Sequence, residues 1–407
     1  MQLELALPIS TKQEKRTLSW NLMTGRGFET DSGVPVSPIL AENLSAAFAS
    51  VQLIAQTIAS LPLYVYRKDA SGARYEDPQH PLARLLAGDP NEHQTVADFF
   101  ELMQANVLWH GNAYAEIVRD TSGRPVELVP HHPGMISVER LPGARGRRLR
   151  YIVSDIDGGS RRLLQEEMLH IRDRSDDGLC GKSRLQRARE AFGQAIAAEK
   201  FAARIWGNSA AMSGFVSHPE TLGPEAAETL RQSLADLYGG LKNAGRIGVL
   251  EEGMTWTALS VSPEDAQLLE SRRFSVESVA RMFGVPPQLI GDTSKTAFAN
   301  MIEASRHFAR FTLAPWCSKW EQALARSLFS EADRATHEIE VNLDELLRGD
   351  PLQRAQTWRV YRELGVVSAN EIRDQEGWNP RTDPDGDVFF APLNLQSEQA
   401  GKPRQEA

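Results

Sequence analysis

Two long stretches of helical periodicity, separated by a short mixed stretch, most restrict what this chain can fold into. The first occupies residues 183–208, where apolar side chains recur at helical spacing. The second begins at Ser262, a favourable N-cap with a proline and two acidic residues after it, and ends near Phe283, where Gly284 follows. A helix of about 20 residues is ~30 Å long. Residues 210–260 should therefore project as a small module from the far end of a helical pair.

Alternating helix and strand patterns precede this pair and predict a mixed α+β domain over residues 37–182. A helix is expected over residues 95–109, with Thr95 as N-cap and Asp98 completing an acidic capping box. Residues 1–36 are polar and lack periodicity, which predicts an arm or mobile terminus. Short strands are expected at residues 113–119, 127–129, 135–139 and 151–154.

An uncharged run from Asn43 to Tyr66 admits two interpretations, an amphipathic helix or a membrane span. Polar side chains fill the face opposite the apolar stripe, and Pro62 interrupts the run. A membrane span needs about 20 predominantly apolar residues, so the amphipathic helix is favoured, followed by a strand at residues 63–66. The apolar stripe consists of Leu44, Phe48, Val51, Ile54, Ala55, Ile58 and Leu61.

A polar loop and a third long helix follow the helical pair. Taken alone, the loop Gly291–Thr296 is a plain connector between helices. The helix should cover residues 298–329 and kink near Phe311, because Pro315 lacks the backbone donor that a helix interior requires. Residues 331–407 predict one strand, two helices and a polar tail.

The charge balance excludes one class of protein, the tight non-specific DNA binder. The chain of 407 residues carries 45 lysines and arginines against 54 aspartates and glutamates, a formal charge of −9. Proteins that hold DNA by neutralising phosphates are usually basic, so this chain would let DNA slide past. Its two cysteines, Cys180 and Cys317, are far apart and form no CxxC pair, which suits a reducing compartment. The N-terminus lacks the basic start and apolar core of a signal peptide.

The segment Gly178–Ser183 is the nearest approach to a nucleotide site. A Walker A loop requires glycine at the position that Asp176 occupies, and a carboxylate there would repel phosphates. A glycine turn before a helix is therefore favoured over a phosphate-binding loop.

Three histidines, His131, His132 and His170, suggest a metal site, but no HxxxH, HExxH or aspartate-rich pattern accompanies them. We expect partly buried polar histidines and no metal. No nucleophile elbow or recognisable carboxylate pair indicates catalysis, so neither an enzyme activity nor a cofactor is expected.

The segment from Arg140 to Arg162 holds seven arginines against Asp155 and Asp157. It is the only dense basic patch of the sequence, and it could contact nucleic acid or an acidic neighbour. A solvated hairpin with charged flanks is the favoured interpretation.

Seven short sequence motifs follow one another along the chain in a characteristic order and spacing. They are GNAYAEI at 111–117, DGLCGKS at 177–183, NAGRIGVLEEGM at 243–254, SPEDAQLLESRRF at 262–274, VARMFGVPPQLIGD at 279–292, FARFTLAPW at 308–316 and SANEIR at 368–373. Together they resemble the portal protein family of tailed phages and gene transfer agents. Each phrase alone is weak, but the order and spacing hold from about Leu44 to Pro392.

The resemblance implies a ring of about twelve subunits at one capsid vertex. Each subunit would have a wing, two stem helices, a clip and a tunnel loop. On this chain it implies an arm at 1–36, the first part of the wing at 37–182, stem helices at 183–209 and 261–290, the clip at 210–260, the tunnel loop at 291–297, a kinked wing helix at 298–330 and a wing or crown region with a tail at 331–407.

The resemblance further implies a channel for double-stranded DNA in packaging and ejection. The partners would be further copies of the chain, the DNA, the major capsid protein, the terminase large subunit and a head–tail adaptor, without a membrane. The protein would assemble in the bacterial cytoplasm and remain in the virion. The tunnel loop would contribute Asp292, Thr293, Ser294, Lys295 and Thr296 to the channel, and the clip would meet the motor or adaptor through Asn243 and Arg246.

Two other classes of protein are weighed against a DNA conduit. An enzyme of DNA packaging or modification needs an intact phosphate loop or a metal cluster, and the sequence has neither pattern. A capsid or adaptor protein without a channel would accommodate the same helices. The polar loop ending in Lys295 and Thr296 between long helices favours the channel.

Overall fold

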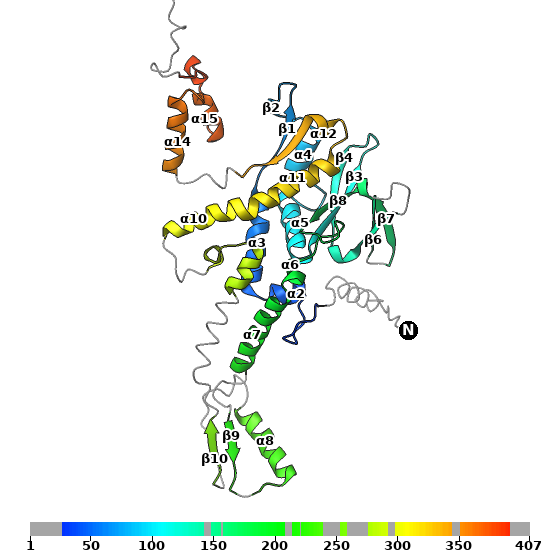
Figure 1. The fold of residues 1–407 in the computed structure, drawn as a ribbon, viewed down its shortest axis with the longest axis vertical. Helices are drawn as coiled ribbons and strands as arrows, with labels where there is room; N and C mark the ends of the chain where they lie inside the picture. Colours follow the sequence, from blue (N-terminus) through cyan, green and yellow to red (C-terminus); the bar gives the residue numbers. More distant parts are fainter. Residues whose placement is uncertain are drawn as a thin grey trace, which may run out of the picture. The chain divides into compact units, whose positions relative to one another are not determined.

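The computed structural model describes residues 27–141, 148–155, 158–207, 214–219, 221–238, 253–258, 276–291, 298–343 and 351–390 (Figure 1). The chain divides into two compact units, Met1–Asn342 and Leu343–Ala407. The first unit mixes helices with small antiparallel sheets, and the second is helical where it is described. The α+β class expected from the sequence is confirmed.

Two helices form the centre of the first unit. Helix α3 (Ser45–Ser60) is the uncharged run, and it packs against α5 (Val96–His110). The expected capping box is present, because the Thr95 hydroxyl accepts from the Asp98 amide while the Asp98 carboxylate accepts from the Thr95 amide. The predicted stripe is buried except for Phe48, which is 53% exposed. The sequence therefore predicted one buried residue too many, because a packed helix buries only one band of its surface.

The described part of the first unit contains three three-stranded sheets, with strand orders β11-β1-β2, β4-β3-β8 and β5-β6-β7, and α5 contacts β3 and β8 of the second. Strand β1, near the start of the unit in sequence, pairs antiparallel with β11, near its end, and Leu63 lies opposite Val341. The strands are β1 (Leu63–Lys68), β2 (Arg74–Glu76), β3 (Asn112–Arg119), β4 (Pro125–His131), β5 (Ile136–Arg140), β6 (Leu149–Ser154), β7 (Ser160–Leu164), β8 (Met168–Arg172) and β11 (His337–Val341).

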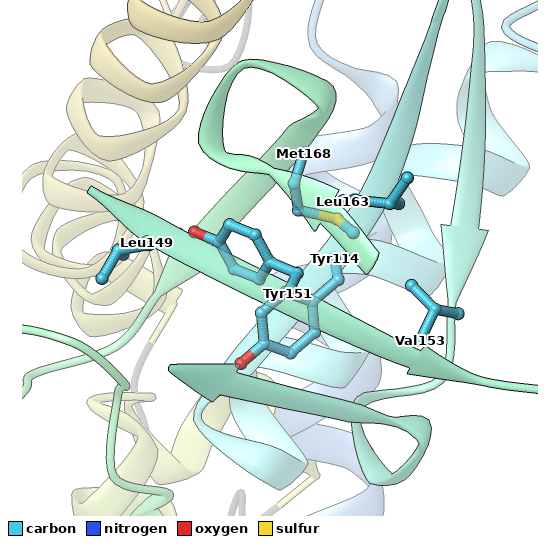
Figure 2. Packing of buried hydrophobic residues seen from close by; sticks show 6 residues of the cluster. All are labelled: Tyr114, Leu149, Tyr151, Val153, Leu163 and Met168. Carbon is cyan, nitrogen blue, oxygen red and sulfur yellow. The ribbon is translucent and has the colours of Figure 1, made fainter. Parts of the chain in front are cut away.

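An aromatic and aliphatic cluster joins two of these sheets (Figure 2). Every second residue of β6 contributes a side chain, which is the period that one face of a strand allows. Figure 2 shows the rings of Tyr114 and Tyr151 side by side, and their centroids are 6.0 Å apart. The cluster consists of Tyr114, Leu149, Tyr151, Val153, Leu163 and Met168.

The first long helical pattern forms two helices rather than one. The short α6 (Arg184–Arg187) ends at Ala188, and α7 (Arg189–Gly207) continues. Residues 276–283 are helical, whereas the expected start at Ser262 lies outside the described residues. Between the two patterns lie β9 (Gly214–Ser217), α8 (Pro224–Tyr238) and β10 (Thr255–Ala258), and the two strands pair antiparallel.

The third long helix is interrupted at the place that the sequence predicted. Helix α10 (Phe298–Phe308) is followed by a π-helical turn η5 (Ala309–Leu313) and then by α11 (Ala314–Leu328). Pro315 occupies the first turn of α11, so the missing amide is accommodated by widening the preceding turn.

Residues 27–36 do not form a mobile arm. Phe28 and Val36 exchange backbone hydrogen bonds of 2.7 and 2.9 Å, and the Asp31 amide donates to Glu190 at the start of α7. A Cβ atom at Gly193 would lie 2.7 Å from the Thr30 hydroxyl oxygen, so this glycine lets the hairpin rest on the helix. The sequence missed this contact because its partners are about 160 residues apart.

The remaining elements are short, and the described part of the second unit holds two α-helices. Among the described residues, no helix is both long and apolar enough to cross a membrane. The other helices are α2 (Pro38–Glu42), α4 (Pro81–Ala87), α12 (Asp333–Thr336), α14 (Pro351–Glu363) and α15 (Ala369–Gln375), and the 3-10 turns are η1 (Pro133–Met135), η2 (Gln165–Glu167), η4 (Pro287–Ile290) and η6 (Pro384–Gly386).

Candidate functional site: the junction of the two long helices

The glycine segment before α6 is shaped by backbone packing. A Cβ atom at Gly181 would lie 2.0 Å from the carbonyl oxygen of Gly111, so only glycine fits. The side chain of Asn112 accepts from the Gly181 amide at 2.7 Å and donates to the Gly181 carbonyl at 2.8 Å. The Ser183 hydroxyl then caps α6 by accepting from the Gln186 amide. The glycine turn before a helix is confirmed.

The lysine of this segment is engaged in ion pairs within the loop. Lys182 lies 3.7 Å from the Asp176 carboxylate, and Arg187 lies 2.7 Å from the same group. These charges lower the pKa of Asp176, with the Arg187 hydrogen bond as the largest cause. The carboxylate that replaces the Walker glycine therefore holds the start of the first helix in place.

Arg184 connects three parts of the first unit. Its Nε donates to Asp173 at 3.0 Å, and its Nη1 donates to the carbonyl oxygen of Met282 at 3.2 Å. Its guanidinium carbon lies 5.5 Å from the centre of the Trp316 ring on α11. One side chain thus joins the start of the first long helix, the end of the second and the helix after the loop.

Asp173 is the anion at the centre of this junction. Its side chain is 10% exposed and pairs with Arg184 and, at 3.6 Å, with Lys319. Burial would raise the pKa of Asp173, but Arg184, the Arg174 amide and Lys319 outweigh it, so the pKa lies below its ordinary value. Lys319 also stacks on Trp316 at 4.4 Å, which makes the junction a compact charged and aromatic cluster.

The π-helical turn supplies a second link to the end of the second long helix. Gly284 ends that helix with φ of +73°, a conformation that favours glycine. The Thr312 hydroxyl in η5 donates to the Gly284 carbonyl, one of the groups that a helix end leaves without a partner inside the helix. Further along α11, the buried Trp320 indole donates to Gln104 of α5 at 2.8 Å.

The three histidines flagged in the sequence have protein partners. His131 lies 3.2 Å from Glu116, and His132 caps η1 by accepting from the Gly134 amide. His170 lies between Asn112 at 3.0 Å and the Tyr151 hydroxyl at 3.2 Å. Burial is the largest cause that lowers the pKa of His170, to about 3. The interpretation as partly buried polar histidines is confirmed.

A cluster that the sequence did not indicate brings together His80, Asp333 and His337, with one candidate ligand atom of each within 4.8 Å of the others. The Nδ1 of His80 accepts from the Leu82 amide, so the neutral ring carries its hydrogen on Nε2. That nitrogen is then a donor and cannot coordinate a metal. His337 also faces Asp77 at 3.5 Å and its Nδ1 lies 2.9 Å from the Thr336 hydroxyl, so each histidine of the cluster has a partner outside it.

A sequence model described as "Phage portal protein" matches residues 45–377, most of the chain. The chain belongs to this family. The probable portal protein of Streptomyces phage phiC31 is 33% identical over 372 residues, covering 89% of this chain and 81% of that one. The portal protein of Enterobacteria phage HK97 is 32% identical over 370 residues, with 90% and 85% covered.

A solved structure described as the neck of a native gene transfer agent particle, computed with C12 symmetry, contains a chain of similar fold. Its TM-score is 0.57 at 26% identity, with 91% of this portal chain and all of that chain covered. The resemblance to portal proteins of phages and gene transfer agents is thereby confirmed.

The channel and clip residues expected for a portal lie outside the described residues. They are Asp292, Thr293, Ser294, Lys295 and Thr296 of the loop, and Asn243 and Arg246 of the inserted module. The described ends of the loop are Gly291, left-handed at φ of +97°, and the start of α10 at Phe298.

The arginine-rich segment of the portal chain is partly neutralised by carboxylates. Arg150 lies 2.6 Å from Glu139, and Arg161 lies 3.1 Å from Glu116. Arg148 faces Glu166 at 3.4 Å, with both side chains exposed. The hairpin favoured from the sequence is therefore charged and solvated on one face only, because Leu149, Tyr151 and Val153 on the other face of β6 are buried.

Proposed function

We propose that this portal protein forms a ring of about twelve copies at one capsid vertex, through which double-stranded DNA is packaged and ejected. The observation that carries the proposal is the junction of Arg184, which ties the ends of both long helices to the helix after the loop. A channel through which DNA is forced needs its helices held in fixed positions relative to one another. The relative described with C12 symmetry supports a count of twelve.

The two long helices serve as the stem and residues 291–297 as the tunnel loop in this proposal. Lys295 of each subunit would add one positive charge to the channel wall, tempered by Asp292. Sparse phosphate contacts position DNA without reading its sequence, and an acidic chain holds it weakly. DNA would therefore pass in either direction.

The inserted module of β9, α8 and β10 serves as the clip that docks the terminase large subunit and later a head–tail adaptor, through Asn243 and Arg246. The wing contacts the major capsid protein. The role is structural rather than catalytic, and no metal or cofactor is part of the proposal. The glycine segment supports this, because Lys182 and Arg187 pair with Asp176 where a phosphate-binding loop would have glycine. The energy for translocation would come from the terminase. The protein would assemble in the host cytoplasm and persist at the capsid vertex.

Electron microscopy of the purified protein, viewed end-on, tests the proposal directly. Rings of about twelve subunits with a central hole are expected. Compact particles without a hole, produced in the presence of capsid and scaffold proteins as well, would contradict it.

Packaging assays test the two regions that contact DNA and motor. Lys295→Glu should slow DNA passage in assembled capsids, while Lys295→Arg, which keeps the charge, should package normally. Arg246→Ala should reduce packaging and leave rings intact. Normal packaging by Lys295→Glu or Arg246→Ala would show that these side chains face elsewhere.

A further inference from the structure

The second unit, Leu343–Ala407, has almost no core among its described residues. Within 354–390, only Ser368 and Gly386 are buried, and no large apolar side chain is. Eight large apolar side chains are instead 42–59% exposed: Val360, Tyr361, Leu364, Val366, Trp378, Val388, Phe389 and Phe390. Such a density of exposed apolar groups marks an interaction surface.

Polar contacts hold this unit together. Glu376 accepts from the Trp358 indole at 2.7 Å and pairs with Arg354 at 2.8 Å. Arg362 donates to the Val388 carbonyl at 2.8 Å and stacks on Phe390 at 4.4 Å. These polar contacts connect the parts of the unit, but they bury little apolar surface. Burial of apolar surface is the main contribution to folding stability.

The helices of this unit are too short to persist alone. Helix α14 has 13 residues and α15 has 7. Isolated helices below about 12–15 residues are marginal in water, and most helical stability comes from a packed apolar face. The unit therefore requires a partner surface that covers its apolar side chains.

The most continuous apolar face lies at the end of α14. Leu364 directly follows the last residue of α14, and its amide donates to the Val360 carbonyl, so it continues the helical spacing. It lies four residues after Val360 and three after Tyr361, which brings its side chain close to both, and Val366 follows in the turn. We propose that this face docks on a second copy of the chain, the neighbouring subunit of the ring. The proposal rests on the proposed function and names one of its subunit interfaces.

Ring geometry argues for a second copy. A ring of identical subunits needs a heterologous interface, in which two different surfaces of the protein meet. A small unit with uncovered apolar groups, joined to a unit with its own core, provides one such surface. The similar chain in a particle computed with C12 symmetry supports neighbours of this kind.

Photo-cross-linking of rings made from the full chain tests the proposal. A benzophenone side chain replaces Val366, and a matched control replaces Val126, which is 51% exposed on β4. Irradiated rings should yield a covalent dimer of twice 45.2 kDa from position 366 and little from position 126. Intact rings whose position-366 product stays at the mass of one chain would overturn the proposal. Absence of rings from the unsubstituted protein would instead count against the proposed function.

A charge placed in the same face provides a second test. Leu364→Glu should weaken ring assembly at least ~10-fold, measured by mass photometry over a concentration series, while Val126→Glu should assemble normally. The midpoint of thermal unfolding of the dissociated chain should not change, because the face is uncovered there. A lowered midpoint in the dissociated chain would assign the face to the same molecule and overturn the proposal.

Discussion

Arg184 combines three tasks that are usually given to different residues. It neutralises a buried carboxylate, satisfies a carbonyl at a helix end and stacks on an indole. Lysine has neither the planar fork nor the reach to do all three.

Arg184→Ala should lower the free energy of unfolding by about 2–4 kcal/mol, because it leaves Asp173 with only Lys319 and the Arg174 amide, and the Met282 carbonyl without its arginine donor. Arg184→Lys should recover only part of this loss. Denaturant unfolding measures both variants. Arg231→Ala, which removes an exposed pair on α8, is the control and should leave the denaturation midpoint almost unchanged. A loss no larger than that of the control would contradict the role of the junction.

His170 links the stability of the first unit to pH. Its pKa is lowered from 6.5 to about 3, mainly by burial, so the unfolded chain binds the proton more readily than the folded one. The stabilisation is therefore present above about pH 6.5 and is lost as the pH falls toward 3. At pH 5 the loss from this group is about 2 kcal/mol.

Replacing His170 with glutamine should flatten the fall in unfolding free energy between pH 7 and pH 5, measured by chemical denaturation at each pH. His93→Gln, at an exposed position, should keep the slope of the original protein. An unchanged slope in His170→Gln would show that the proton binds elsewhere.

The sequence predicted the chemical role of single residues better than it predicted which residues they contact. Asp176 was enough to reject a phosphate loop, and the structure adds the ion pairs with Lys182 and Arg187. The clamp by Asn112 on Gly181 could not be predicted, because its partners are 69 residues apart and neither belongs to a periodic pattern. The Arg184 junction was missed for the same reason, since Met282 lies 98 residues away.

At the scale of elements, the π-helical turn is a structural adaptation to one proline. It brings the Thr312 hydroxyl onto the carbonyl of Gly284 and so couples the third long helix to the second. π-turns within helices are frequent at functional sites.

Thr312→Val keeps the shape of the side chain and removes its donor. It should destabilise the protein by about 0.5–1.5 kcal/mol, the net contribution of one hydrogen bond, because Gly284 is exposed and water can bind its carbonyl in place of the hydroxyl. Thr312→Ser retains the hydroxyl and should recover most of the stability. Differential scanning calorimetry measures both variants, and equal losses would assign the effect to packing rather than to the hydrogen bond.

Long elements with strong periodicity were predicted closely, including α3, α5 and the interruption before Pro315. Short strands were missed where the pattern was weak. Strand β7 has two arginines in its five residues and one buried side chain, so it shows little apolar alternation. Strands β8 and β9 were missed as well, and the break at Ala188 was hidden because the apolar spacing continues across it.

At the scale of the whole molecule, the net charge of −9 predicts weak affinity for free DNA. Purified rings should bind linear duplex with a Kd weaker than about 1 µM at 150 mM salt, measured by fluorescence anisotropy. Few phosphate contacts should also give a shallow dependence on salt between 50 and 200 mM. Nanomolar binding or a steep salt slope would contradict a conduit of low friction.

The family could be predicted from the order of short sequence motifs along the chain, because that order does not depend on any single contact in the fold. The positions of the channel and clip residues were accessible only through that resemblance. The loop at residues 291–296 has no apolar periodicity, so without the resemblance the sequence predicts only a connector between helices there.

The pairing of β9 with β10 has an evolutionary consequence. Gly214 lies opposite Ala258, so the chain enters and leaves the inserted module at adjacent points. A segment with adjacent ends can be exchanged for an unrelated one without disturbing its host. Recombination could therefore replace this module as a cassette, and a lineage could acquire a new tail or packaging motor while its capsid-facing part remained unchanged.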